Sequence, residues 1–142
     1  EYEFDKIFPG CRLLDIHEYL AELGMRAEGV AGQGYLYHDP CHTPIKQANP
    51  TKLAAELLGQ PTLLSDRCCG EAGTLGTARP DIARQLRYRK AEELKAGVHQ
   101  LTGQPRADAA TKLLTTCPAC SLGKPGNRRS WSGVNWSYSI RL

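Results

Sequence analysis

Cys68 and Cys69 stand side by side in the stretch SDRCCGEAGTLG, residues 65–76, and a glycine follows them directly. Adjacent cysteines rarely form a disulfide with each other, because their side chains diverge along the backbone and disulfide geometry is demanding. They are also poorly placed to occupy two corners of one tetrahedral metal site. Such a pair needs either no partner or a partner with several binding positions, and the fold must bring that partner to it.

Apolar spacing and turn residues predict helices and strands that alternate along the chain. The helices are expected at residues 12–23, 51–59 and 80–98, and the strands at 35–37, 62–65 and 111–116. This alternation predicts an α/β domain in which helices flank a small parallel sheet. Residues 123–142 show no helical periodicity, and we expect an irregular tail there.

The longest predicted helix begins at Pro80 and Asp81, since proline suits a first turn and aspartate suits the positive end of the helix dipole. One apolar stripe runs along this helix and consists of Ile82, Leu86, Leu94 and Val98. The rest of this helix is predicted to be a solvated surface, because it carries the basic residues Arg84, Arg87, Arg89, Lys90 and Lys95. The first predicted helix is also amphipathic, with an apolar stripe of Leu13, Ile16, Leu20 and Leu23.

Five of the six cysteines follow directly on predicted strands. Cys41 comes after the first strand, Cys68 and Cys69 come after the second, and Cys117 and Cys120 come after the third. The carboxyl ends of parallel strands lie at one edge of a sheet, where ligand sites gather. We therefore expect loops that carry cysteines at the carboxyl ends of the strands, with five thiols converging there.

Converging thiolates suit zinc or an iron–sulfur cluster. Structural zinc takes four ligands, so it would leave one of the five cysteines unused. A cluster of several irons offers different metal atoms to Cys68 and Cys69, which resolves the difficulty of the adjacent pair. Gly70 and Gly73 would then let the backbone approach closely and direct N–H groups to anionic sulfur.

Two histidines flank the first of these cysteines, at positions 38 and 42. As neutral imidazoles, His38 and His42 could ligate metal or donate a hydrogen bond to a thiolate. The alternative is that His38 is structural and His42 caps a turn. Glu71, inside the cysteine loop, is either a surface carboxylate or a proton carrier. Cys11 lies outside the three loops and is expected to be a buried small residue or a spare thiol.

The net charge of +3 comes from the end of the chain, where five basic residues and no acidic residue follow Asp108. A basic tail is not the basic stripe on a folded face that nucleic-acid binding usually shows, so we expect no nucleic-acid partner. No run approaches the ~20 apolar residues of a membrane helix, and no signal-peptide pattern is present. We expect a soluble, cytoplasmic domain, with peripheral contact to the inner face of the membrane as the alternative.

Three stretches of the chain resemble the cysteine-rich CCG domain family: YHDPCHTP at 37–44, DRCCGEAGTLG at 66–76 and TTCPACSLG at 115–123. The family includes one of the subunits of heterodisulfide reductase, the iron–sulfur subunit of glycolate oxidase and lactate-utilisation proteins. The version fused to bacterial FAD-linked oxidases is the most similar. The resemblance implies a [4Fe–4S] cluster, which is non-cubane in the heterodisulfide reductase relatives. Its ligands would be Cys41, Cys68, Cys69, Cys117 and Cys120.

The resemblance also implies how the chain is organised. Residues 1–10 would be the remnant of a preceding segment, 11–122 the CCG domain, as the second of two tandem copies, and 123–142 the tail. The parent protein would be a flavin-linked dehydrogenase of 2-hydroxy acids such as glycolate or lactate. Electrons would pass from its FAD-linked oxidase domain through a ferredoxin-like domain to this one, and then to a quinone or another acceptor.

In this scheme the domain oxidises no substrate on its own. Two alternatives remain open from the sequence. One is a catalytic domain of the heterodisulfide reductase type, in which the cluster itself reduces a disulfide. The other is a structural module that binds zinc through the same thiolates.

Overall fold

The computed structural model describes residues 3–27, 34–45, 47–71, 73–107, 111–117 and 120. The described helices are α1 (Phe4–Ile7), α2 (Ile16–Glu22), α3 (Pro50–Leu58), α4 (Leu75–Ala78) and α5 (Pro80–Thr102). The described strands are β1 (Gly34–His38), β2 (Thr62–Ser65) and β3 (Thr111–Leu114). The predicted irregular tail at 123–142 lies outside the described residues.

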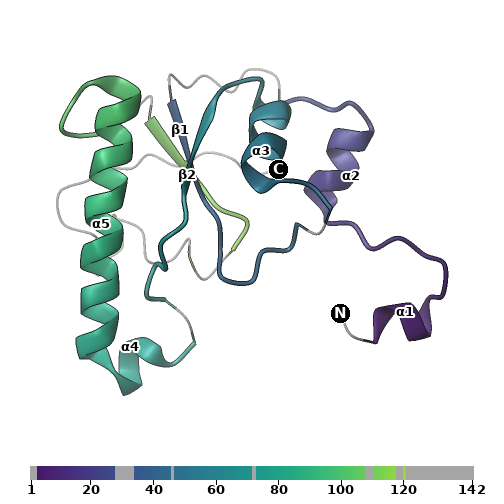
Figure 1. The fold of residues 1–142 in the computed structure, drawn as a ribbon, viewed down its shortest axis with the longest axis horizontal. Coiled ribbons are helices and arrows are strands. Elements are labelled where there is room, and N and C mark those ends of the chain that lie inside the picture. The colour runs from purple at the N-terminus through teal and green to yellow at the C-terminus, as the bar shows by residue number, and fades with distance from the viewer. Residues whose placement is uncertain are drawn as a thin grey trace.

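The three strands form one parallel sheet in the order β2-β1-β3 (Figure 1). Leu36 at the centre of β1 pairs with Leu63 of β2 on one side and with Leu113 of β3 on the other. All five residues of β1 are buried, as expected for a central parallel strand. The predicted α/β class, with a small parallel sheet between helices, is confirmed.

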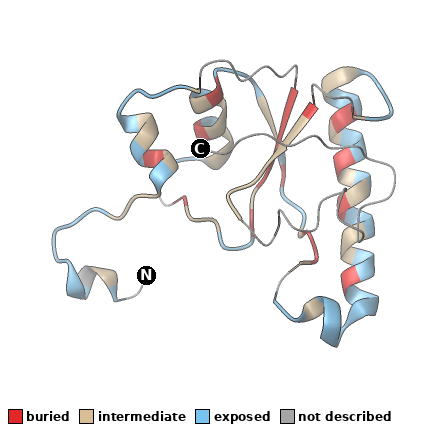
Figure 2. Ribbon diagram, turned by 180° about the vertical axis from the view of Figure 1, so that it is seen from behind, coloured by how far each residue is buried: buried red, intermediate tan, exposed pale blue. Residues whose placement is uncertain are grey.

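Helices cover both faces of this sheet, with α5 on one face and α3, backed by α2, on the other (Figure 1). Because successive side chains of a strand point to opposite faces, neighbouring residues of β1 enter different cores. Leu36 packs with Leu94 and Val98 of α5, whereas Tyr37 packs with Ile45 and with Leu53 of α3. Figure 2 shows that buried residues lie along β1 and along one side of α5.

Capping residues set the ends of the helices. α3 begins at Pro50, where the side chain of Asn49 accepts a hydrogen bond from the Lys52 amide, and it ends at Gly59 in a left-handed conformation. α5 continues to Thr102, four residues beyond its predicted end, and Gly103 ends it with a φ of 69°. The amphipathic pattern of α5 is longer than the sequence interpretation recognised.

The apolar stripe predicted for the first helix does not form its buried face. The helix begins only at Ile16, because Asp15 caps it in a capping box with Glu18. Ile16 and Leu23 are exposed, while the Glu18 side chain is 3% exposed. The Glu18 carboxylate accepts hydrogen bonds from the amides of Gln47 and Ala48, at 2.5 and 2.8 Å, and so ties α2 to the segment before α3.

Two predictions for the longest helix are also wrong in detail. Lys90 lies in the protein interior, although the sequence interpretation placed it on a solvated surface. Ile82, the first member of the predicted stripe, is exposed and lies in the first turn of α5. In the described part of the chain, none of the helices has the length and apolar composition that crossing a bilayer requires.

The close approach of α5 to β1 generates the first test. A Cβ added at Gly97 would lie 2.6 Å from Cδ2 of the buried Leu36. Overpacking of this kind costs about 1–3 kcal/mol, whereas alanine gains about 1 kcal/mol over glycine in a helix. We expect Gly97→Ala to lower the free energy of unfolding by about 1 kcal/mol in urea denaturation.

Leu36→Val provides the control, because valine lacks the methyl groups that the new Cβ would meet. In a double-mutant cycle, Gly97→Ala should cost less in the Leu36→Val background than in the wild type. A gain in stability from Gly97→Ala alone would show that α5 and β1 are not in this close contact.

Candidate metal centre

The three strands end in loops that carry the five predicted ligands. β1 ends at His38, three residues before Cys41, and β2 ends at Ser65, three residues before Cys68. β3 ends at Leu114, and two more cysteines follow at 117 and 120. The parallel pairing of the strands therefore places all three loops at the carboxyl edge of the sheet.

Thiols from different loops lie close together at this edge. The sulfur of Cys41 is 4.0 Å from that of Cys68, and the sulfur of Cys69 is 3.2 Å from that of Cys120. The amide of Cys120 donates to the sulfur of Cys117 at 3.4 Å, which links the two cysteines of the third loop. A disulfide requires about 2.05 Å between sulfurs, and all these cysteines are free thiols.

The adjacent pair divides its side chains between two neighbours. Cys68 faces Cys41 from the first loop, whereas Cys69 faces Cys120 from the third. Cys69 is buried and Cys41 is exposed, so the site has one enclosed side and one side open to water. The loop after β2 thus presents two thiols in two different directions.

Gly70 shapes the loop immediately after this pair. Its φ of 73° lies in the left-handed region, and its amide donates to the sulfur of Cys68 at 3.4 Å. A Cβ at this position would lie 3.0 Å from the carbonyl oxygen of Ala83 in α5. Gly73 also has a positive φ, of 49°, but nothing lies within 4 Å of the place a Cβ would take.

His38 is 3% exposed and lies at the enclosed side of the site. Its Nδ1 lies 3.2 Å from the carbonyl oxygen of Ser65, which can only accept, so Nδ1 carries the proton and Nε2 presents a lone pair. Nε2 has no hydrogen-bond partner among the described residues. This nitrogen and the sulfurs of Cys69 and Cys120 all lie within 4.8 Å of one another.

The other predicted residues have different surroundings. His42 is exposed and lies outside this group of ligand atoms. Cys11 is exposed rather than buried, so the expectation of a buried small residue is wrong and a spare thiol remains. Glu71 is half-buried and forms an ion pair of 2.9 Å with Arg87 of α5, which occupies the carboxylate that the sequence suggested as a proton carrier.

When no metal is bound, the surroundings of Cys41, Cys120 and His38 favour the neutral forms of these side chains. Burial, followed by interactions with Cys69 and Cys117, raises the pKa of the Cys120 thiol well above its usual range. Burial and the neighbouring Cys68 also raise the pKa of Cys41. The pKa of His38 is lowered, first by burial and then by the ammonium of Lys90. Burial, and then the neighbouring sulfurs, therefore disfavour the thiolate forms of Cys41 and Cys120 when no metal is bound.

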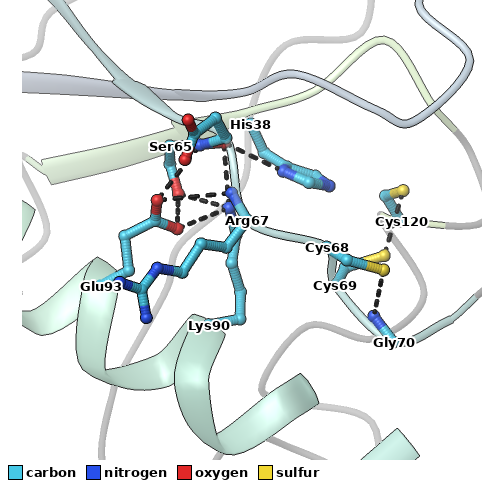
Figure 3. A network of polar contacts seen from close by, with 10 residues as sticks. His38, Ser65, Arg67, Cys68, Cys69, Gly70, Lys90, Glu93 and Cys120 are labelled. Carbon is cyan, nitrogen blue, oxygen red and sulfur yellow. Dashed lines mark hydrogen bonds and ion pairs between the residues drawn. The ribbon is translucent and has the colours of Figure 1, made fainter.

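Sequence reasoning missed the polar network behind this site, which Figure 3 shows. Lys90, Glu93 and Ser65 are joined by hydrogen bonds between α5 and the end of β2. One signal in the sequence could have found it. Lys90 occupies the gap between Leu86 and Leu94 in a stripe that repeats every four residues, so helical spacing puts it on the buried face.

A parallel sheet that gathers five thiols and a buried imidazole at its carboxyl edge defines a cysteine-rich α/β domain. The profile of the CCG family, a cysteine-rich domain, matches residues 35–123, a range that contains all five cysteines of the three loops. The chain belongs to this CCG family.

Curated relatives share this part of the chain. The chain is 29% identical over 120 residues to a subunit of the fumarate reductase (CoM/CoB) of Methanothermobacter marburgensis, covering 78% of this chain and 22% of that protein. It is 33% identical over 90 residues to the glycolate oxidase iron-sulfur subunit of Escherichia coli, covering 59% of this chain and 22% of that protein. An uncharacterized iron-sulfur protein of Methanococcus maripaludis is 28% identical over 118 residues, which are 77% of this chain and 21% of its length.

The chain thus spans about a fifth of the length of these relatives. The relatives from Escherichia coli and Methanococcus maripaludis are named as iron–sulfur proteins. The relatives from Methanothermobacter marburgensis and Escherichia coli are named as subunits of a reductase and of an oxidase. No solved structure gives a significant match to the chain.

Gly70 and Gly73 form a matched pair for testing the loop. Alanine at either position must adopt a left-handed backbone, which costs about 1–2 kcal/mol. At Gly70 the new Cβ also presses on the Ala83 carbonyl oxygen and on Leu86. We expect Gly70→Ala to lower the free energy of unfolding by about 1–3 kcal/mol more than Gly73→Ala in urea denaturation. Equal losses would show that α5 does not pack on the loop.

The raised pKa of Cys120 leads to another test, on the metal-free protein. Only the thiolate reacts with iodoacetamide, so a raised pKa keeps Cys120 slow and makes its rate continue to rise between about pH 8 and pH 10. The same thiol in urea-unfolded protein should be faster and should level off earlier. Mass spectrometry of the alkylated peptide measures both rates. Similar pH profiles in the two states would contradict the clustered, partly buried thiols.

Proposed function

We propose that this chain binds an iron–sulfur cluster through Cys41, Cys68, Cys69, Cys117 and Cys120 and serves as an electron-transfer domain. The observation that carries the proposal is the convergence of thiols from three separate loops, with sulfur–sulfur distances of 4.0 and 3.2 Å between loops. Thiols this close, without a disulfide, are suited to sharing metal.

The donors fit such a group in number and in chemistry. Iron–sulfur clusters are held by cysteine thiolates, and their reduction potential depends on hydrogen bonds to sulfur and on exposure to solvent. Cys68 and Cys69 point to different neighbours, which suits a partner with more than one metal atom. A [4Fe–4S] cluster, of the non-cubane kind, accounts for five thiols, where structural zinc accounts for four. When bound, the cluster supplies one-electron transfer.

Residues around the cysteines would set the charge and the solvent access of the bound cluster. The amide of Gly70 donates to the sulfur of Cys68, and the amide of Cys120 donates to that of Cys117. Such hydrogen bonds stabilise negative charge on sulfur and make the site easier to reduce. His38 offers a lone pair beside Cys69 and Cys120, while the burial of Cys69 keeps water from the enclosed side.

We further propose that the parent protein is a flavin-linked dehydrogenase of 2-hydroxy acids. The relative named as a glycolate oxidase iron-sulfur subunit supports this class, because glycolate is a 2-hydroxy acid. The chain would then receive electrons from an FAD-linked oxidase domain through a ferredoxin-like domain. It would work beside a second CCG copy and pass electrons to a quinone or another acceptor, in the cytoplasm or at the inner face of the membrane.

One observation favours a second candidate, a structural zinc module. His38, Cys69 and Cys120 bring three possible ligand atoms within 4.8 Å of one another, and zinc accepts both imidazole and thiolate. Zinc would then leave some of the remaining thiols unused. The third candidate, direct reduction of a disulfide, predicts that adding a disulfide substrate changes the electron paramagnetic resonance spectrum of the site.

Metal analysis decides between the cluster and the zinc module. In protein purified without oxygen from iron-fed cells, we expect about four iron and four sulfide ions per chain. Cys68→Ser and Cys69→Ser should lose most of this iron and alter the electron paramagnetic resonance spectrum. Cys11→Ser is the matched control, because Cys11 is an exposed thiol outside the three loops, and it should keep the wild-type content. One zinc without sulfide would overturn the cluster proposal.

A further inference from the structure

A lysine and a glutamate lie together behind the cysteine loop on α5. The Lys90 side chain is 1% exposed, and its ammonium is 2.9 Å from the Glu93 carboxylate. Burying an ammonium costs several kcal/mol unless it is paired and hydrogen-bonded. Neutral residues of similar size would fill the same space at lower cost. The hydrogen-bond partners of Lys90 and Glu93 therefore indicate what the buried pair does.

Nearly all of these hydrogen bonds go to the last residue of β2 and to the start of the cysteine loop that follows it. Lys90 donates to the carbonyl oxygen of Ser65 at 2.9 Å and to its hydroxyl at 2.5 Å. The Ser65 hydroxyl donates to Glu93 at 2.7 Å. The second carboxylate oxygen of Glu93 accepts from the amides of Asp66 and Arg67, at 3.2 and 3.4 Å. We call the Lys90 ammonium and the Glu93 carboxylate together the Lys90–Glu93 clamp.

The clamp holds three consecutive residues, 65–67, and the adjacent cysteines are the next two in the chain. A loop is usually the more mobile part of a fold, because its backbone groups lack regular partners. Here the carbonyl of Ser65 and the amides of Asp66 and Arg67 all have charged partners on a rigid helix. The direction in which Cys68 and Cys69 leave the sheet is therefore defined by α5.

The same Ser65 carbonyl connects the clamp to the imidazole. It accepts from Lys90 and lies 3.2 Å from Nδ1 of His38 (Figure 3). A carbonyl oxygen has two lone pairs, so it can serve both donors. This contact defines the tautomer of His38 and turns its Nε2 toward Cys69 and Cys120.

We propose that Lys90 and Glu93 are positioning residues of the metal centre, which fix the Cys68–Cys69 loop and the His38 ring through Ser65. The part of this proposal that concerns the bound metal rests on the proposed function. The part that concerns the loop rests on the described contacts alone.

The two charges of the clamp have opposite effects on a redox centre at this site. Reduction adds negative charge, which a nearby ammonium favours and a nearby carboxylate opposes. Because both groups are largely withdrawn from water, salt screens them less than it screens surface charges. Loss of positive charge at Lys90 should lower the reduction potential of the centre, and loss of negative charge at Glu93 should raise it. General loosening of the loop would move both variants in the same direction.

The first experiment tests the loop without requiring a bound cluster. The double variant Lys90→Met/Glu93→Leu removes both charges and leaves no unpaired ion, and replacements of this kind are often neutral for overall stability. It also leaves the amides of Asp66 and Arg67 without their acceptor. Hydrogen exchange measured by mass spectrometry on metal-free protein should be about tenfold faster at these two amides, with β1 unchanged.

The control is an exposed pair on the same helix with the same spacing. Lys95 and Glu92 lie 2.8 Å apart, with side chains 46% and 49% exposed. Lys95→Met/Glu92→Leu removes the same two charges and should leave exchange at residues 66 and 67 as in the wild type. Unchanged exchange in the Lys90→Met/Glu93→Leu protein, or equal acceleration in the control, would overturn the proposed positioning of the loop.

The second experiment measures the midpoint potential of the metal-loaded protein by electron paramagnetic resonance. Lys90→Met should shift it downward, Glu93→Gln upward, and Lys90→Arg, which keeps the charge, least. Shifts of the two neutral variants in the same direction would overturn the assigned electrostatic role. Protein that never contains a cluster would count against the proposed function alone, because the exchange measurement still decides whether the clamp positions the loop.

Discussion

The parallel pairing of three short strands is the interaction on which the site depends. Each strand end fixes where its loop begins, and pairing through β1 holds the three ends at one edge of the sheet. A parallel sheet must be covered on both faces, and α5 and α3 do so with two separate apolar cores. The thiols meet because the strands are in register, and helix packing keeps the strands in register.

Much of this architecture could be predicted from the sequence, because it follows from short-range patterns. The strand predicted at 62–65 coincides with β2, and the helix predicted at 51–59 lies within one residue of α3 at both ends. The convergence of the cysteine loops follows from the parallel topology alone, so Cys41, Cys68 and Cys69 could be predicted as neighbours. Which sulfur faces which could not, because that depends on the conformation of each loop after the strand ends.

Buried charge is what the sequence interpretation failed to find. Glu18 and Lys90 are both nearly inaccessible to water, yet their residue types normally indicate solvated surface. Each is buried because it binds backbone groups outside its own helix: Glu18 accepts from the amides before α3, and Lys90 donates to the carbonyl at the end of β2. Residue type alone cannot reveal such partners, since they come from parts of the chain about 25–30 residues away.

The unequal exposure of the thiols has a consequence for how this site responds to a change of charge. Water reaches the side of Cys41, whereas Cys69 and His38 lie against groups that hydrogen bonds already hold in place. Water molecules must reorient when charge arrives, but fixed dipoles and paired side chains need hardly move. In the proposed electron-transfer role, most of the reorganisation energy would thus come from the open side, and covering Cys41 with another protein surface would make electron transfer faster.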